Sequence, residues 1–492
     1  MTTLIALLPL LLVLGLLASG RAGALVAGAA GLLATVAAAL ALLWPSGGAG
    51  EGAGAPPLLP LFLRETAAGL WLSWHVVAII AAGMFFHRCL QARDGAAAAG
   101  GTVEATPRRL WAVCFLLAPF GESVTGFGIG YIIALTALRR LGLGGLPALL
   151  LGLYSQSLVP WGALAIGTTV GATLAGLAPS TLGEASALLQ VPIHALYLVI
   201  YWRLARTAGI TVPAAQKLDD VAWTALLLAL IWLCNRYSDV EIAGAAPTAL
   251  LLALRFWRDE RPDGPRLRAA LAANAPYVAL TAALCATRLV PPLRDTLKPL
   301  WSLRPFDNQP AFAPFYAPGF WLVAIGLIVV WRARASLARV AAEAARGAWR
   351  ACTVTILFVV MAELYVGSGM AETIAEALRG AAGRGAALGV PLFAGIGGFL
   401  TGGGAAANAM LMPMATALAR ATGLDPAWIA AVQNSVCTNL TMLSPIRVSM
   451  GAAILALAAP EAALYRRAWP LALPSLLTGL LAVTMLLLLP PP

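Results

Sequence analysis

Charged residues are scarce in this chain of 492 residues. Aspartate, glutamate, lysine and arginine contribute 11% of the sequence, against 60% for hydrophobic residues, and the mean hydropathy is +0.85. A soluble domain carries about 25% charged residues. The shortage excludes a soluble globular fold. It predicts an all-α, polytopic integral membrane protein, because each crossing of a hydrocarbon core about 30 Å thick takes roughly 20 apolar helical residues.

Cysteine and histidine are also scarce, which limits the metal, disulfide and catalytic sites that the chain can form. The six cysteines show no CxxC spacing, so neither a metal cluster nor a disulfide framework is indicated. His75 and His194 lie in apolar runs without the paired acid and serine or cysteine that hydrolysis requires. The net charge of +11 is spread over the connections between apolar runs and forms no single patch, which argues against nucleic-acid binding. We therefore expect no catalytic residue, metal or cofactor.

The apolar runs predict about 12 membrane spans and two interrupted segments. Residues 110–140 and 386–420 are predicted to be broken, re-entrant hairpins, because glycines interrupt each run. The predicted spans are residues 3–19, 24–45, 66–87, 146–174, 185–204, 220–236, 241–257, 268–289, 318–332, 350–368, 426–446 and 467–489.

The distribution of arginine predicts the topology. Basic residues gather in alternate connections, as expected of cytoplasmic loops, whereas connections such as 45–60 contain almost none. This scheme places the hairpin 110–140 on the cytoplasmic side and the hairpin 386–420 on the external side, which is typical of an inverted-topology repeat. The predicted units are N-terminal helices (1–65), a first repeat (66–206), linking helices (207–349) and a second repeat (350–492).

Two glycine motifs in these hairpins resemble each other. They are Thr125-Gly126-Phe127-Gly128 and Thr401-Gly402-Gly403-Gly404, and a polar cluster follows each after a further apolar run. Gln156, within Ser155-Gln156-Ser157, lies 31 residues after Thr125, and Gln433, within Gln433-Asn434-Ser435, lies 32 residues after Thr401. Paired, glycine-broken segments in corresponding halves are the best sequence indication of a transporter's binding site. Close helix packing is the alternative explanation for these glycines.

The chemistry expected at such breaks is anion binding. Glycine permits unwound backbone, and the helix that restarts after each break directs free N–H groups and a positive dipole end at the ligand. Arg447, after Ser444-Pro445, is expected to pair with a substrate carboxylate or to extend to the interface. The predicted substrate-binding residues are Gly126, Phe127, Gly128, Ser155, Gln156, Gly402, Gly403, Gly404, Asn408, Gln433, Asn434, Ser444 and Arg447.

Two acidic residues lie within apolar segments. Glu122 precedes the first glycine motif, and Glu363 lies in the span 350–368. An ionisable side chain at that depth costs about 2.5 to 3.5 kcal/mol, so it commonly faces a cavity and carries a proton or ion. Both are predicted proton-coupling residues. The alternative for each is a structural carboxylate.

Several segments together resemble the L-lactate permease family, bacterial transporters of lactate and related 2-hydroxy monocarboxylates that are described as proton symporters. The segments are Glu122-Ser123-Val124-Thr125-Gly126-Phe127-Gly128, Trp161-Gly162-Ala163-Leu164, Ser368-Gly369-Met370, Leu400-Thr401-Gly402 with Asn408-Ala409, and Met442-Leu443-Ser444-Pro445. The chain departs from the family where Gly403-Gly404 and Ala405-Ala406-Ala407 replace Ser-Asp and a Thr-Ser-Ser run. The resemblance is therefore to a divergent member.

The resemblance and the motifs together predict a secondary active transporter, not an enzyme. Its cargo would be lactate or a related 2-hydroxy acid, moved with a proton by alternating access across a bacterial plasma membrane, the inner membrane in a Gram-negative cell. The expected partners are a small organic anion, protons, the bilayer and, as an option, a second copy of the chain. A membrane-embedded enzyme for a lipid-linked substrate and a proton-translocating subunit of a larger complex are the alternatives.

Overall fold

The computed structural model describes residues 1–47, 58–94 and 101–489, and the regular secondary structure of that part of the chain is helical. Extended pairing there is limited to one isolated bridge between Leu303 and Phe312. Most of the expected external connection 45–60, and the last three residues of the expected second repeat, lie outside the described residues.

Eight helical segments among the described residues are long and apolar enough to span a membrane, or nine if one bent pair counts as a span. The twelve expected spans are thus not all confirmed. Two expected spans correspond to shorter apolar helices, α1 (Thr2–Ala18) and α14 (Pro318–Arg332). The eight segments are Ala24–Leu43 within α2 (Ala24–Gly47), α3 (Leu58–Asp94), α9 (Pro179–Thr207), α10 (Ala214–Tyr237), α12 (Gly264–Leu289), α15 (Leu337–Gly367), Met370–Thr401 and Glu461–Leu488.

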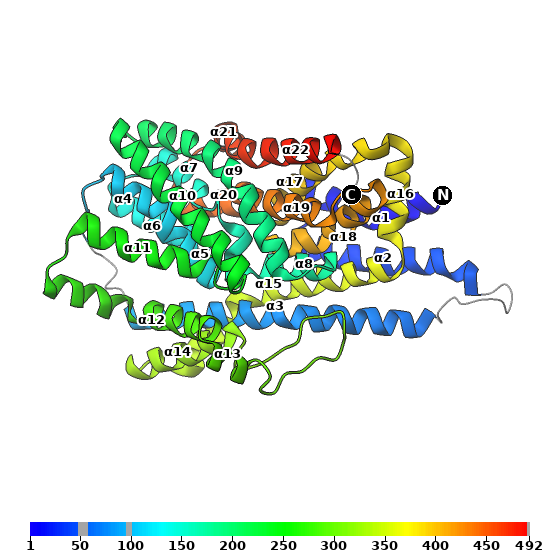
Figure 1. Cartoon of the computed structure of the whole chain (residues 1–492), viewed down its shortest axis with the longest axis horizontal. Coiled ribbons are helices and arrows are strands. Elements are labelled where there is room, and N and C mark those ends of the chain that lie inside the picture. The colour runs from blue at the N-terminus through cyan, green and yellow to red at the C-terminus, as the bar shows by residue number, and fades with distance from the viewer. Residues whose placement is uncertain (48–57, 95–100, 490–492) are drawn as a thin grey trace.

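Two of the longest helices, α3 and α15, pack against each other along one side of the molecule (Figure 1). Gly69 allows their close approach, because a Cβ there would lie 2.7 Å from the Cα of Val360. Small residues at such contacts let membrane helices pack backbone to backbone. Helices α12 and α14 and the short α13 (Pro291–Leu297) cover the outer side of this pair at the bottom of the view.

Both expected hairpins are broken at their glycine motifs. In the first, α4 (Pro107–Ala112) continues through a π-helical turn (Val113–Leu117) into α5 (Ala118–Thr125), and the chain restarts as α6 (Ile129–Arg140). In the second, α16 (Met370–Ala382) precedes α17 (Val390–Thr401), and α18 (Gly404–Thr422) follows the break.

Two further breaks occur where the sequence analysis expected continuous spans. The expected span 146–174 consists of α7 (Gly145–Tyr154) and a second segment, the 3₁₀ turn Val159–Trp161 continued by α8 (Gly162–Ala175), and the two are bent by 61° at the break 155–158. The expected span 426–446 is α19 (Pro426–Leu440), which ends before Ser444, and α20 (Pro445–Ile454) then begins. Proline at the first position of α20 explains this restart, since its fixed φ suits a helix start and disfavours helix before it.

The remaining elements enclose these broken helices. Helix α11 (Ala245–Glu260), expected as the span 241–257, has only 16 residues and packs against α5. The C-terminal segment consists of α21 (Glu461–Ala468) and α22 (Leu473–Leu488), and α22 packs against α9 and α19. In Figure 1, α8, α18 and α19 lie between α22, at the top of the view, and the α3–α15 pair, whereas α11 lies beside α5 at the left.

Candidate functional site

The first break unwinds through three consecutive residues with positive φ. These are Gly126 (φ 70°), Phe127 (φ 54°) and Gly128 (φ 80°). Glycine adopts this region freely, whereas Phe127 does so against its steric preference. Gly126 also contacts the next break, because a Cβ there would collide with the side chain of Ala163. Phe127 is 40% exposed although both neighbouring glycines are buried, so its ring marks the open side of the tip.

Glu122 links this tip to the other half of the chain. Its carboxylate accepts hydrogen bonds from the N–H groups of Gly128 (3.2 Å) and Gly130 (3.1 Å) at the start of α6. Arg447, on the first turn of α20, donates from Nη2 to the same carboxylate at 3.1 Å. Both side chains are almost completely buried. One cation and two N–H donors thus surround the carboxylate.

Arg447 also reaches the polar cluster of the first half. Its Nη1 donates to Oε1 of Gln156 at 3.2 Å, and Nε2 of Gln156 in turn donates to Oγ of Ser155 at 3.4 Å. Ser155 donates to the carbonyl of Gly152, which ties the cluster to α7. Four of the predicted residues, Glu122, Ser155, Gln156 and Arg447, therefore form one connected group.

The second break is simpler and more open. Gly402 has φ 68°, and a Cβ there would lie 3.1 Å from Oγ of Ser444. Nothing lies within 4 Å of the position that a Cβ on Gly403 would occupy. The hydroxyl of Ser444 and the Nε2 atom of Gln433 are buried and have no hydrogen-bond partner within the described parts of the chain. Polar atoms in this condition are uncommon and are candidates for ligand contacts.

Asn408 and Asn434, both predicted ligands, are hydrogen-bonded to each other. Nδ2 of Asn408 donates to Oδ1 of Asn434 (2.8 Å) and to the carbonyl of Gly167 (2.9 Å). Nδ2 of Asn434 donates to Thr168 and Ser186, each at 3.0 Å. All the amide N–H groups of the two asparagines are thus used within the protein. The pair fastens α18 and α19 to α8 and α9 and leaves no donor for a substrate.

A left-handed turn at the start of α8 carried no signal in the sequence. Ala163, Leu164 and Ala165 have φ of 49°, 55° and 59°. Each residue in this conformation costs roughly 1 to 2 kcal/mol. Such strain gathers at functional sites. It lies here between the two tips, since Ala163 meets Gly126 and Gly167, on the same helix, meets Gly404 and Ala405.

Glu363 lies in a different group from Glu122. Its Oε1 accepts a hydrogen bond of 2.7 Å from Nε2 of Gln309, which comes from the connection between α13 and α14. Glu65 of α3 is close enough to affect Glu363 electrostatically. The structure therefore assigns the two predicted proton-coupling acids to separate surroundings, and only Glu122 has an arginine partner.

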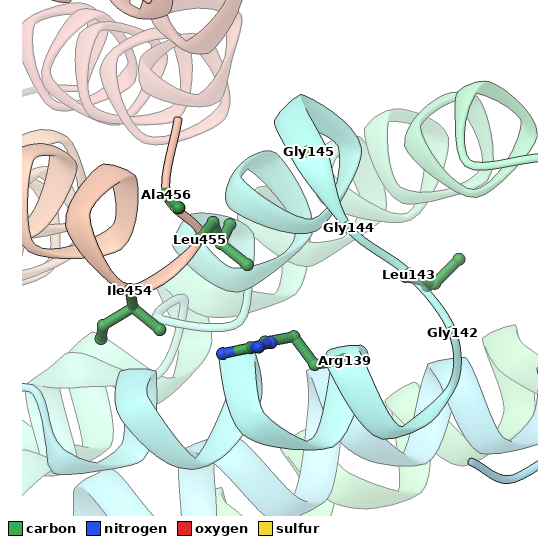
Figure 2. A pocket seen from close by; sticks show the side chains of 8 residues that line it. All are labelled: Arg139, Gly142, Leu143, Gly144, Gly145, Ile454, Leu455 and Ala456. Carbon is green, nitrogen blue, oxygen red and sulfur yellow. The ribbon is translucent and has the colours of Figure 1, made fainter. Parts of the chain in front are cut away.

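A cavity of about 240 Å³ lies at the far ends of two of the broken helices (Figure 2). It is lined by Arg139 at the end of α6, the turn 142–145 that leads into α7, and residues 454–456 at the end of α20. Helices α6 and α20 both begin beside the Glu122–Arg447 pair and both end at this cavity. The cavity is thus separated from the pair by the length of these short helices.

One comparison with known proteins gives a match. The family model for L-lactate permease matches residues 302–489, which contain the second hairpin, Glu363 and Arg447. No curated protein matches the chain. The model covers the second half of the site and leaves Glu122 outside its range. In an apolar, multi-pass helical chain, residues 302–489 are thus similar to the L-lactate permease family, which is a family of transporters and not of enzymes.

Proposed function

We propose that this protein moves a small monocarboxylate, lactate or a related 2-hydroxy acid, together with a proton across a bacterial plasma membrane by alternating access. The observation that carries the proposal is the buried ion pair between Glu122 and Arg447, 3.1 Å apart, where the two halves of the chain meet. A substrate carboxylate needs a cation inside the membrane, and Arg447 is a buried cation at the start of one of the broken helices.

Competition for Arg447 would couple the proton to the substrate. A substrate carboxylate that binds the guanidinium displaces the carboxylate of Glu122. An unpaired buried charge costs several kcal/mol, so the displaced Glu122 takes up a proton and becomes neutral. Release of the substrate reverses both steps, because Glu122 loses its proton when it pairs with Arg447 again. Anion and proton then move together, and the site carries the same net charge whether loaded or empty.

The packing of the two halves supports alternating access. Each half contains a glycine-broken hairpin followed by a second broken element, α7–α8 in the first and α19–α20 in the second. The halves pack crosswise, since α8 contacts α18 and α19 while α20 contacts α6 and α7. Rocking of one half against the other would move α20, and with it Arg447, relative to Glu122. The cavity beside Arg139 is our candidate for the route to one side of the membrane.

Uptake into proteoliposomes tests the proposal. With an imposed pH gradient, acid outside, the wild-type protein should accumulate labelled lactate and glycolate. Glu122→Gln should lose accumulation driven by the gradient and retain exchange of lactate for lactate, because Arg447 still binds the anion. Glu363→Gln is the matched control, a buried acid without an arginine partner, and should accumulate normally. Unchanged accumulation by Glu122→Gln, or loss of coupling only in Glu363→Gln, would contradict the role of Glu122.

A further inference from the structure

Tyr131 is the third residue of α6, in the first turn after the broken tip. It is completely buried. Its ring packs against Gly152 of α7, and its hydroxyl faces Gly451 of α20, where a Cβ would collide with the hydroxyl oxygen. The missing side chain at position 451 therefore makes the space that the hydroxyl fills.

The hydroxyl of Tyr131 has no hydrogen-bond partner among the residues that the structure describes. A buried polar atom without a partner costs about 1 to 3 kcal/mol, and most tyrosine hydroxyls in protein interiors avoid this cost. Inside the hydrocarbon core of a membrane, bulk water cannot supply the missing hydrogen-bond partner. An unpaired hydroxyl in this place is explained if it receives a partner only when a ligand is bound.

The surroundings of the hydroxyl limit what that ligand is. Arg447 and Gly451 are four residues apart on α20 and so lie on one face of the helix. Tyr131 and Arg447 are also close enough to interact electrostatically. A carboxylate held by Arg447 would thus place its adjacent carbon, and a hydroxyl on that carbon, on the side of Tyr131.

We infer that Tyr131 recognises the 2-hydroxyl group of the substrate and sets the preference for 2-hydroxy acids over acids without that hydroxyl. The inference rests on the proposed function, since it concerns the anion that Arg447 binds. Tyr131 would donate to, or accept from, the substrate hydroxyl. An acid such as propionate would leave the tyrosine unpaired, as it is in the empty protein, and would therefore bind less well.

The test compares lactate with propionate, which differ only in the 2-hydroxyl group. In proteoliposomes with a pH gradient, the wild type should show a KM for lactate about tenfold lower than for propionate, the effect of one hydrogen bond. Tyr131→Phe should raise the KM for lactate to that for propionate and leave the KM for propionate unchanged. Tyr154→Phe is the matched control: its hydroxyl is also buried and unpartnered among described residues, but it lies in an aromatic cluster with Phe115 and Tyr197.

Every outcome of this comparison either supports or overturns the inference about Tyr131. Equal affinity of the wild type for the two acids, or an unchanged lactate preference in Tyr131→Phe, overturns the inference and leaves proton-coupled transport standing. A wild type that takes up neither acid removes both. If Tyr131→Phe does not reach the membrane, Gly451→Ala replaces it. Its methyl group displaces the hydroxyl, so a reduced lactate preference supports the inference and an unchanged preference overturns it.

Discussion

Arg447 donates a hydrogen bond of 3.1 Å to Glu122, although 325 positions separate the two residues in the sequence. The contact joins the start of α20, in the second half of the chain, to the last turns of α5, in the first. Both side chains are buried, so neither charge is relieved by water. The pair therefore holds the two halves of the chain together and is also the centre of the proposed coupling between proton and substrate. The two roles can be tested separately.

Arg447→Gln tests the structural role. Removing one member of a buried ion pair typically costs about 3 to 5 kcal/mol, because the remaining charge has no partner. Glu122→Gln combined with Arg447→Gln removes both charges and should recover much of that loss. Thermal unfolding in detergent should then rank the wild type above the double variant and the double variant above Arg447→Gln. A double variant less stable than Arg447→Gln would show that the pair is not coupled.

Asn434→Ala should lower stability and spare substrate affinity. The substitution leaves Thr168, Ser186 and Asn408 each without one partner in the membrane interior, and a lost buried hydrogen-bond partner costs about 1 to 3 kcal/mol. Asn274→Ala is the control, since this asparagine is exposed on α12 and donates within its own helix. The thermal midpoint should fall for Asn434→Ala alone, and the KM for lactate should stay at the wild-type value. A raised KM with normal stability would restore Asn434 as a substrate ligand.

The two hairpin breaks could be predicted because the glycines that cause them are visible in the sequence. Glycine is the residue that adopts positive φ without strain, and Gly126, Gly128 and Gly402 all do so. The break before α20 also had a signal, the Ser444-Pro445 step, but the apolar residues around it suggested a continuous span. No comparable signal exists for Ala163 to Ala165, because alanine and leucine ordinarily favour helix.

The partners of the polar residues could not be predicted from the sequence. The sequence predicts that Arg447 pairs with a substrate or extends to the interface, and that Glu122 carries a proton or is a structural carboxylate. Their contact with each other depends on how two distant breaks dock. Asn408 and Asn434 had the chemistry of ligands, yet their N–H groups are used by neighbouring helices. Residue type predicts which groups can bind, and only the tertiary arrangement shows which of them are still free to do so.

The first hairpin should also respond to pH at its N-terminal end, in α4. Arg109 of α4 donates two hydrogen bonds of 2.7 Å to the carboxylate of Glu260 on α11. These bonds hold the pKa of Glu260 below its ordinary value. A lowered pKa means that the stabilisation is present above the ordinary pKa and is lost as the pH falls through the folded value.

The effect of this pair should be small, because both side chains are about one-third exposed. Exposed ion pairs contribute up to about 1 kcal/mol. Thermal unfolding of the wild type and Glu260→Gln between pH 7 and pH 3 would measure it as the difference between the two curves. The wild type should be the more stable at pH 7 and the difference should vanish in acid. A difference that grows in acid would contradict the sign of the shift.

Gly402 and Gly403 provide a matched pair of substitutions within the second tip. At Gly402, alanine would have to adopt φ 68° and place its Cβ 3.1 Å from Ser444 Oγ. The left-handed conformation alone costs roughly 1 to 2 kcal/mol. Gly403 has φ −140°, which any residue adopts, and a Cβ there meets nothing within 4 Å. Gly402→Ala should therefore lower the thermal midpoint, and Gly403→Ala should not.

Transport by Gly403→Ala distinguishes a glycine that serves helix packing from one that contacts the substrate. If the substrate approaches the backbone of the tip, the methyl group of Gly403→Ala occupies part of its space, and the KM for lactate should rise while the protein remains as stable as the wild type. If the glycines serve only helix packing, Gly403→Ala should transport normally, since it has no neighbour to disturb. Uptake assays on protein of verified stability distinguish the two. Normal transport by Gly403→Ala would remove the second tip from the binding site, because the open space at this residue is where a bound anion would have to lie.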